Sequence, residues 1–348
     1  MKKIISMVLA LAMILSLALC TTAFADEEPT YQLKLGHYFA ATQGGGVLAE
    51  SIAEKVREKS NGRIEITVYT DSMLGSQSEL SEGIRMGTID MILNEWSNIA
   101  TVNGFSQGLI LGFPFLYQSW DHIRAFYDSE VMDQMKADLE AEQGIICLGC
   151  SADGFRKIYT QIPIESIDDF SKLKIRVPDN QIYTATMAAL GAAPTIVAAA
   201  ELYTSLQNGI VNALERPADG MYSNNLYEQT SYIIDTDHIW CDANCFINAA
   251  VFNKLDEEAQ QALREGVEEA CREHIDYMEE RDVESLGKLV DECDQTLLEI
   301  DRDELTEIMK EEVWPQFVNT IPNGEQMIED ILALADTLAE ETEEIVEE

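Results

Sequence analysis

Three arginines of this chain stand in contexts where a guanidinium group could hold an anion. Arg176 lies in the alternating run Ile175-Arg176-Val177, which places it opposite its two apolar neighbours on a strand. Arg156 follows Gly154-Phe155, and Arg216 is the only Lys or Arg between Val177 and Asn253. A planar guanidinium binds a carboxylate through two parallel hydrogen bonds, which a lysine cannot match. The alternative for each arginine is a structural ion pair with one of the many acids.

The balance of charge makes these arginines informative. The 348 residues include 63 Asp+Glu and 23 Lys+Arg, which gives a formal net charge of −40. Such a surface repels nucleic acid and anionic membranes, so we expect neither as a partner. The content of 46% hydrophobic and 8% aromatic residues is that of a folded globular protein. At this length two lobes are favoured over a single core.

Motifs of known catalytic and metal sites are absent from the sequence. There is no Gly-x-Ser-x-Gly elbow, no phosphate-binding loop and no His-Glu-x-x-His motif, so we expect no cofactor and no metal. Acids are so frequent that a glycosidase-like carboxylate pair stays open. A metal site at His238, Cys241 and Cys245 is a weaker alternative to thiols that are buried and free. The six cysteines beyond residue 25 are Cys147, Cys150, Cys241, Cys245, Cys271 and Cys293.

The N-terminus has the pattern of an export signal. Lys2 and Lys3 precede an apolar run over residues 4–20, and Ala23-Phe24-Ala25 is a small-x-small cleavage pattern. We expect residues 1–25 to be a signal peptide and the mature protein to lie in the periplasm or on the outer face of the cytoplasmic membrane. Lipidation at Cys20 is the alternative.

The elements that must position the arginines alternate between strands and helices. Strands are expected at 31–36, 63–69 and 89–93, with helices at 47–59 and 78–86 between them. This order predicts a mostly parallel sheet with helices on both faces. Ligands bind beyond the carboxyl ends of such strands, which are followed here by residues 37–42, 70–76 and 94–98.

A second series of similar size indicates a second lobe. A strand at 145–148 precedes it, and the series itself contains strands at 173–177 and 194–197 and helices at 181–190 and 200–208. From about residue 256 the sequence is helical and acidic, which is typical of a solvated helix that packs across both lobes.

A set of ordered motifs resembles one protein family. The motifs are Leu35-Gly36-His37, Ser72-Met73-Leu74-Gly75-Ser76-Gln77-Ser78-Glu79, Arg85-Met86-Gly87-Thr88-Ile89-Asp90, Phe113-Pro114-Phe115-Leu116, Gly154-Phe155-Arg156, Leu173-Lys174-Ile175-Arg176-Val177-Pro178, Leu190-Gly191-Ala192, Glu201-Leu202-Tyr203 and Leu206-Gln207-Asn208-Gly209. In this order, over about residues 31–317, they resemble the solute-binding subunit of tripartite ATP-independent periplasmic (TRAP) transporters of the DctP type.

The resemblance implies an α/β, two-lobed periplasmic-binding-protein-like fold of class II type, with hinge strands and a long interlobe helix. Lobe 1 would comprise residues 26–153 and about 242–281, and lobe 2 residues 154–241 and about 282–348. The family closes on a small organic anion between the lobes and delivers it to TRAP membrane permease subunits. The expected protein is a monomer and not an enzyme.

The resemblance also assigns ligand-binding residues. The arginine that grips the carboxylate falls on Arg176, a second ligand arginine on Arg156, and a polar contact after the third strand on Glu95. The chain departs from the family pattern at Arg216, where a neutral Asn is usual, and at Ala199, where an aromatic residue is usual. Trp96 or Trp240 could fill the space at Ala199, and His37 and Asn244 complete the candidate set.

Three arginines favour a ligand with more than one anionic group, or with one carboxylate and several hydroxyl groups. Three other functions stay open at this point. They are a solute-binding protein of an ATP-driven (ABC) importer or of a sensor, a secreted hydrolase, and a surface interaction protein without a ligand.

Overall fold

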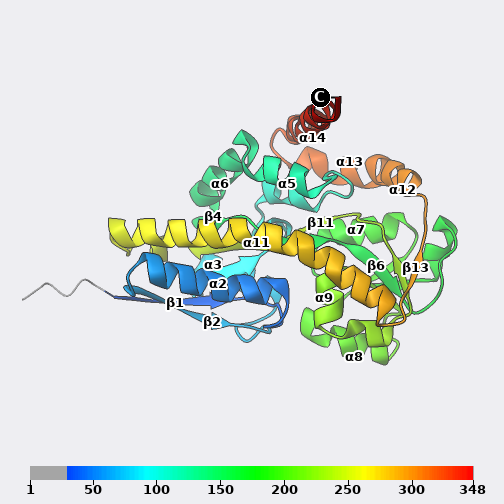
Figure 1. The fold of residues 1–348 in the computed structure, drawn as a ribbon, viewed down its shortest axis with the longest axis horizontal. Coiled ribbons are helices and arrows are strands. Elements are labelled where there is room, and N and C mark those ends of the chain that lie inside the picture. The colour runs from blue at the N-terminus through cyan, green and yellow to red at the C-terminus, as the bar shows by residue number, and fades with distance from the viewer. Residues whose placement is uncertain (1–29, 348) are drawn as a thin grey trace, which may run out of the picture.

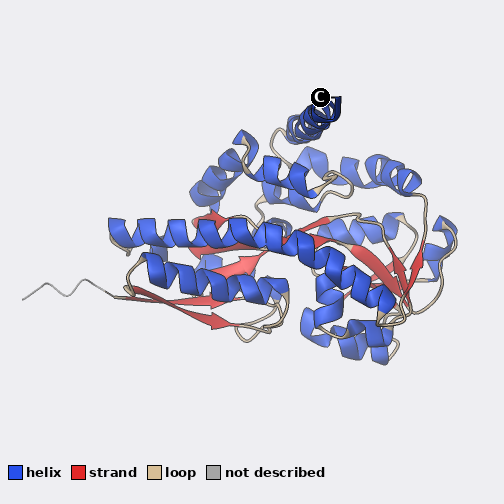
Figure 2. Cartoon of the chain, viewed as in Figure 1, coloured by secondary structure: helices blue, strands red, loops and turns tan. Residues whose placement is uncertain are grey.

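The computed structural model of the protein describes residues 30–347 and contains two large sheets covered by helices (Figure 1). Figure 2 shows the strands of the two sheets inside and the helices outside. The expected signal peptide, residues 1–25, and Cys20 lie outside the described residues. Within the described range no helix combines the length and the apolar character that a membrane span requires.

The first sheet has five strands, with helices on both faces. One face packs against α2 (Gly44–Lys59), and the other packs against α3 (Gln77–Met86), α4 (Trp96–Asn103) and α6 (Glu130–Gln143). In spatial order the strands are β2 (Ile64–Tyr69), β1 (Tyr31–Gly36), β3 (Met91–Asn94), β12 (Asn244–Asn248) and β4 (Ile145–Gly149).

The second sheet has six strands and is likewise covered on both faces. On one side lies α7 (Gln181–Ala189), and on the other lie α8 (Leu202–Gln207) and α9 (Ala218–Ser223). In spatial order the strands are β13 (Thr296–Leu298), β10 (Tyr232–Ile234), β6 (Lys157–Thr160), β9 (Ala213–Arg216), β7 (Lys174–Val177) and β8 (Ala193–Ile196).

Three segments join the two sheets. The strands β5 (Ala152–Phe155) and β11 (Trp240–Asp242) pair antiparallel, and each is continuous along the chain with strands of both sheets. The helix α11 (Glu257–Asp291) is 35 residues long and runs along both lobes (Figure 1). Its buried residues contact the cores of both lobes, among them Leu263 in the first and Leu289 in the second. The prediction of a two-lobed α/β fold with hinge strands and a long interlobe helix is confirmed.

The remaining helices and helical turns complete the fold. Because β12 is antiparallel to both of its neighbours and β6 is antiparallel to β9 and β10, the sheets are mixed and less purely parallel than the sequence predicts. These other elements are η1 (Ser106–Gly112), α5 (Trp120–Tyr127), η2 (Ile167–Lys172), η3 (Ala199–Glu201), η4 (Leu226–Gln229), α10 (Ala249–Phe252), α12 (Arg302–Ile308), η5 (Met309–Val313), α13 (Trp314–Phe317), η6 (Val318–Thr320) and α14 (Gly324–Glu347).

The C-terminal helix α14 bears on how the chain divides into lobes. It packs against α5, where a ring nitrogen of His122 lies 2.7 Å from the carbonyl oxygen of Ile331. Because α5 precedes β4, it belongs to the first lobe, whereas β13, which also follows α11, belongs to the second sheet. The segment after α11 therefore contacts both lobes. We therefore keep the division into residues 26–153 with 242–281 and residues 154–241 with 282–348 as a proposal for the two moving bodies.

Candidate functional site

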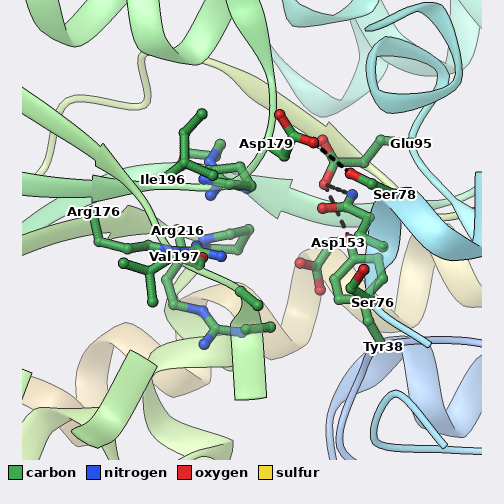
Figure 3. Close-up of a pocket in the computed structure, with 16 residues that line it drawn as sticks. Tyr38, Ser76, Ser78, Glu95, Asp153, Arg176, Asp179, Ile196, Val197 and Arg216 are labelled. Atoms are coloured by element: carbon green, nitrogen blue, oxygen red, sulfur yellow. Dashed lines mark hydrogen bonds between the residues drawn. The ribbon is translucent and has the colours of Figure 1, made fainter. Parts of the chain in front are cut away.

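A cavity of about 240 Å³ lies between the two lobes (Figure 3). Most of its wall follows the carboxyl ends of strands β1, β3, β7, β8 and β9, where open α/β sheets bind ligands. The residues that line it are Tyr38, Ser76, Gln77, Ser78, Glu95, Asp153, Arg156, Arg176, Pro178, Asp179, Ile196, Val197, Ala198, Ala199, Arg216 and Pro217. Figure 3 shows Arg176 and Arg216 on one side of the cavity, opposite Tyr38, Ser76, Ser78, Glu95 and Asp153.

Arg176 on β7 has no direct counter-ion among residues 30–347. Its Nε donates to the carbonyl oxygen of Val197 at 2.9 Å, and no acid of the described chain forms an ion pair with its guanidinium. Its side chain is only 6% exposed, and burial lowers the pKa to about 10. The group is therefore charged at neutral pH, and its two terminal nitrogens remain available to an anion in the cavity.

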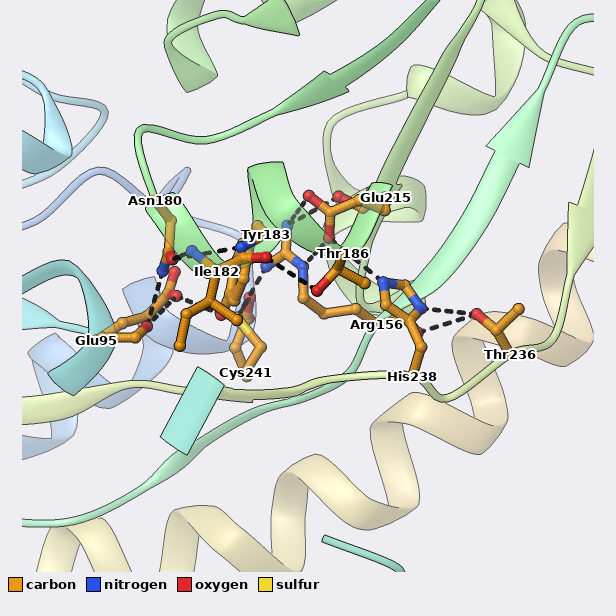
Figure 4. Close-up of polar contacts among 12 residues, drawn as sticks. Glu95, Arg156, Asn180, Ile182, Tyr183, Thr186, Glu215, Thr236, His238 and Cys241 are labelled. Atoms are coloured by element: carbon orange, nitrogen blue, oxygen red, sulfur yellow. Dashed lines mark hydrogen bonds and ion pairs between the residues drawn. The ribbon is translucent and has the colours of Figure 1, made fainter. Parts of the chain in front are cut away.

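Arg156 has its charge compensated within the protein (Figure 4). Its Nε and Nη2 donate to the two carboxylate oxygens of Glu215, the latter at 3.0 Å, and its Nη1 donates to the sulfur of Cys241 at 3.1 Å. Its guanidinium also lies over the ring of Tyr183, 4.8 Å from the centroid. Burial alone would lower the pKa of Arg156, but Glu215 outweighs it and holds that pKa well above the usual value.

Arg216, at the end of β9, makes a single side-chain hydrogen bond within the described part of the chain. Its Nη2 donates to the side-chain oxygen of Gln43 at 3.3 Å. Burial lowers the pKa of Arg216, and the nearby charges of Asp153 and Asp219 oppose that effect. Its charge is thus partly balanced by acids of the protein itself.

Glu95 supplies hydrogen-bond acceptors on the facing wall. Its Oε1 accepts from the hydroxyl of Tyr38 at 3.0 Å and from Nε2 of Gln77 at 2.8 Å. Its Oε2 accepts from the hydroxyl of Tyr183 at 2.7 Å, which is a bond between the two lobes. A carboxylate held by several donors is fixed in position, so a ligand hydroxyl meets a preformed acceptor.

Further hydrogen bonds hold the lobes together at the edge of the cavity. Ser78 donates to the carboxylate of Asp179 at 2.8 Å, and Nδ2 of Asn180 donates to Oγ of Ser97 at 2.9 Å. The capping box of α3, in which Ser76 is the N-cap and Glu79 its partner, fixes the first turn of the helix, which carries Ser78. The structure thus corresponds to a closed arrangement of the lobes.

Comparison with known proteins decides the family. A sequence model of the bacterial extracellular solute-binding protein family 7 (DctP) matches residues 35–320. The chain belongs to this family. It is 30% identical over 322 residues to a solute-binding protein of Chromohalobacter salexigens, an alignment that covers 92% of this chain and 93% of that protein.

Two solved structures of similar proteins contain a bound sugar acid. A TRAP periplasmic solute-binding protein from Roseobacter denitrificans with bound L-galactonate has a TM-score of 0.80 and 27% identity, over 87% of this chain and 99% of that one. One from Chromohalobacter salexigens with bound D-glucuronate has a TM-score of 0.81 and 28% identity, over the same shares of the two chains. The present family 7 protein is accordingly a TRAP-type solute-binding protein.

The structure brings four of the eight predicted site residues of this family 7 protein to the cavity. Arg176, Arg156, Arg216 and Glu95 all line it, although Arg156 is occupied by Glu215. The segments 37–42, 70–76 and 94–98, which the sequence predicts to lie at the ligand-binding edge of the sheet, also reach the cavity. They contribute Tyr38, Ser76 and Glu95 to its wall. Whether each of the four contacts the ligand stays a proposal.

The other four predicted residues lie elsewhere. Trp96 packs against Phe246 with ring centroids 5.2 Å apart, and Trp240 packs against Phe155 at 5.0 Å. His37 and Asn244 are also buried and do not line the cavity. Neither tryptophan fills the space beside Ala199, because both rings belong to the hydrophobic core. An aromatic residue in a sequence does not by itself distinguish a core position from a pocket wall.

Sequence reasoning missed several lining residues, chiefly Gln77, Ser78, Asp153 and Asp179. A usable signal existed for most of them. Ser78 lies in the first turn of α3, just after the N-cap Ser76, and Asp179 follows strand β7, so both lie at strand-to-helix connections of an α/β sheet. Asp153 lies inside a hinge strand, a position that only the paired strands reveal.

The six cysteines within residues 30–347 are free thiols. Cys147 and Cys150 bring their sulfurs to 3.8 Å, and among the described residues no group of three or more His, Cys, Asp or Glu could hold a metal. The alternative metal residues have other partners, because His238 bonds to the hydroxyl of Thr236 at 2.7 Å and Cys241 to Arg156.

Asp153 is expected to make the stability of the protein depend on pH. Burial, helped by the charge of Asp219, raises the pKa of Asp153 from 3.8 to about 6. The folded protein thus binds the proton of the Asp153 carboxyl more tightly than the unfolded chain does. The free energy of unfolding therefore falls as the pH rises from about 3.8 to about 6. Asp153→Asn keeps the acceptor for Gln43 and should stabilise the ligand-free protein by about 3 kcal/mol at pH 7.

The measurement is chemical denaturation of both proteins in steps between about pH 4 and pH 7. The difference in unfolding free energy should be largest at the upper end and shrink towards zero at the lower end. A difference that does not change with pH would show that the carboxyl of Asp153 does not titrate in this window.

Proposed function

We propose that this solute-binding protein captures a monocarboxylate rich in hydroxyl groups, of the aldonate or uronate class, and delivers it to a TRAP permease. One observation carries the proposal. Arg176 presents a buried guanidinium without a counter-ion, and across the cavity Glu95 and Asp153 present acceptors. A carboxylate suits the first wall and hydroxyl groups suit the second.

The distribution of charge favours one carboxylate over two. Arg156 is compensated by Glu215, and Arg216 lies near the acids Asp153 and Asp219. Arg176 and Arg216 both lack a direct ion pair within the described residues, but the nearby acids offset burial less at Arg176, whose pKa falls to about 10. Arg176 is therefore the least compensated of the three arginines and the strongest partner for an anion. A second carboxylate would face the acids of the other wall, where like charges repel. Of the two ligand types that the three arginines suggest, one carboxylate with several hydroxyls therefore fits better.

The similar proteins support this class of ligand. The Roseobacter protein holds L-galactonate and the Chromohalobacter protein holds D-glucuronate, and each of these is a single carboxylate on a chain or ring of hydroxyl groups. We further propose that the protein is exported after removal of residues 1–25, acts as a monomer, and returns its ligand chemically unchanged. These points rest on the family and on the sequence of the N-terminus.

A calorimetric panel tests the proposal. Gluconate, galactonate, glucuronate and galacturonate are compared with succinate and malate, on protein refolded to remove any copurified ligand. At least one hydroxylated monocarboxylate should bind tenfold or more tightly than either dicarboxylate, a difference of about 1.4 kcal/mol. Tighter binding of succinate would refute the proposed class, and conversion of the bound acid, followed by mass spectrometry, would point to a hydrolase.

A further inference from the structure

A second cavity, of about 310 Å³, adjoins the first. The two share Tyr38, Ala199 and Arg216 in their walls, so they meet at these three residues. We call the first the inner chamber and the second the outer chamber. The outer chamber is no smaller than the inner one, which makes it large for a vestibule that holds only water.

The outer chamber lies between the lobes and has a polar wall. Asp71 and Ser72 come from the loop after β2, while in the second lobe Tyr203 lies on α8 and Asn224 caps the end of α9. Gln43 links the two sides, since its side-chain oxygen accepts from Nδ2 of Asn224 at 3.1 Å and its Nε2 donates to Asp153 at 3.1 Å.

Several of these side chains have hydrogen-bonding atoms that no residue of the described chain uses. Nδ2 of Asn224 is used by Gln43 and by the carbonyl oxygen of Gly220, but its Oδ1 accepts no hydrogen bond from the described chain. The carboxylate of Asp71 is likewise without a donor among residues 30–347. Both are acceptors, and the hydroxyl of Ser72 adds a donor. This mixture of acceptors and a donor suits the hydroxyl groups of a sugar.

The passage between the chambers is lined by small side chains. Ala198, Ala199 and Ala200 follow β8 as three exposed alanines. Ala198 lines the inner chamber, Ala200 the outer chamber, and Ala199 both. A methyl group at each position leaves the passage open, whereas a large side chain at Ala199 would close it.

From this geometry we infer that the protein accepts a glycosylated sugar acid, with the acid unit in the inner chamber and a second sugar ring in the outer one. The inference rests on the proposed function, because Arg176 must hold the carboxylate of the first unit. The second unit is neutral, since the outer wall carries the acid Asp71 and shares its only arginine, Arg216, with the inner chamber. The ligand class is then a disaccharide with one carboxylate.

Calorimetry with matched pairs tests the inference. Gluconate is compared with lactobionate and melibionate, which are gluconate carrying a galactosyl group at the fourth and the sixth oxygen. We expect at least one of the two to bind as tightly as gluconate or more tightly. Gluconate binding together with hundredfold weaker binding of both glycosylated acids would overturn the inference and leave the proposed function intact. Failure of every acid, gluconate included, would reject both.

Two variants locate the second ring. Ala200→Phe fills the outer chamber and should weaken binding of the glycosylated acid at least tenfold, while gluconate binding stays within twofold. Asp71→Asn keeps the shape and tolerates the backbone φ of 53° at this position, and should weaken only the glycosylated acid. Ala250→Phe, at an exposed alanine outside both chambers, is the matched control. Equal loss for both ligands in the Ala200 variant would contradict the placement.

Discussion

Replacing Arg176 by methionine is expected to weaken binding of a hydroxylated monocarboxylate by about 30-fold to 4,000-fold. The range corresponds to the 2–5 kcal/mol that removal of one partner from a buried charge pair costs. The effect is large because the carboxylate would enter a buried site whose other guanidinium groups already face acids of the protein. Isothermal titration calorimetry with the best ligand of the panel measures it.

The same substitution should stabilise the protein without ligand. Burial lowers the pKa of Arg176 from 12.5 to about 10, so the folded protein holds this cation at a cost of about 3 kcal/mol relative to water. Methionine has a similar length and no charge, so it removes that cost without opening a large cavity. Higher thermal stability together with lost binding is the signature of a residue kept for its ligand.

Two further variants provide an intermediate case and a control. Arg176→Lys keeps the charge but loses the paired geometry and the bond from Nε to Val197, so its affinity should fall between wild type and the methionine variant. Arg85→Ala removes an exposed arginine on α3 and should leave affinity and stability unchanged. A methionine variant that is less stable than wild type would mark Arg176 as a structural residue.

Much of the fold follows from local patterns in the sequence. The strand at 31–36 agrees with β1 at both ends, and the helix at 78–86 starts one residue after α3. Such elements are set by periodicity and by local signals such as the N-cap Ser76, which depend on neighbouring residues. The antiparallel placement of β12 between β3 and β4 depends on contacts between residues about 100 to 150 positions apart, and no local pattern encodes it.

In the candidate site, too, some features could be predicted from neighbouring residues and others could not. Arg176 was predictable because its place on a strand follows from its two neighbours. The compensation of Arg156 was not, since Glu215 lies 59 positions away and is one of 63 acids. The sequence therefore identifies which groups can hold an anion, but the number of uncompensated charges, which decides between one carboxylate and two, emerges only from the packed structure.

Neutralising Glu215 is expected to have the largest effect on stability. Glu215 is fully buried, and Arg156, which it compensates, is 4% exposed. Burial raises the pKa of Glu215 and Arg156 opposes that rise, so desolvation of the carboxylate offsets part of the attraction within the pair. Glu215→Gln keeps the shape but leaves a buried guanidinium without a counter-ion, and we expect a net cost of about 3–5 kcal/mol. Chemical denaturation of the ligand-free protein measures the loss. Glu284→Gln, which breaks an exposed pair with Lys288, is the control and should cost under about 1 kcal/mol.

The same variant tests why the site prefers one carboxylate. Without Glu215 the guanidinium group of Arg156 would also lack a direct counter-ion, so a dicarboxylate gains a further partner in the cavity wall. The affinity for succinate relative to gluconate should then rise tenfold or more, as one charge-assisted hydrogen bond contributes about 1.5 kcal/mol or more. The Arg156→Met, Glu215→Leu double variant, an apolar pair of similar volume, should recover stability but not the gain for succinate. If Glu215→Gln lowers stability and leaves that ratio unchanged, Arg156 has no access to the ligand and the single charge of Arg176 alone sets the preference.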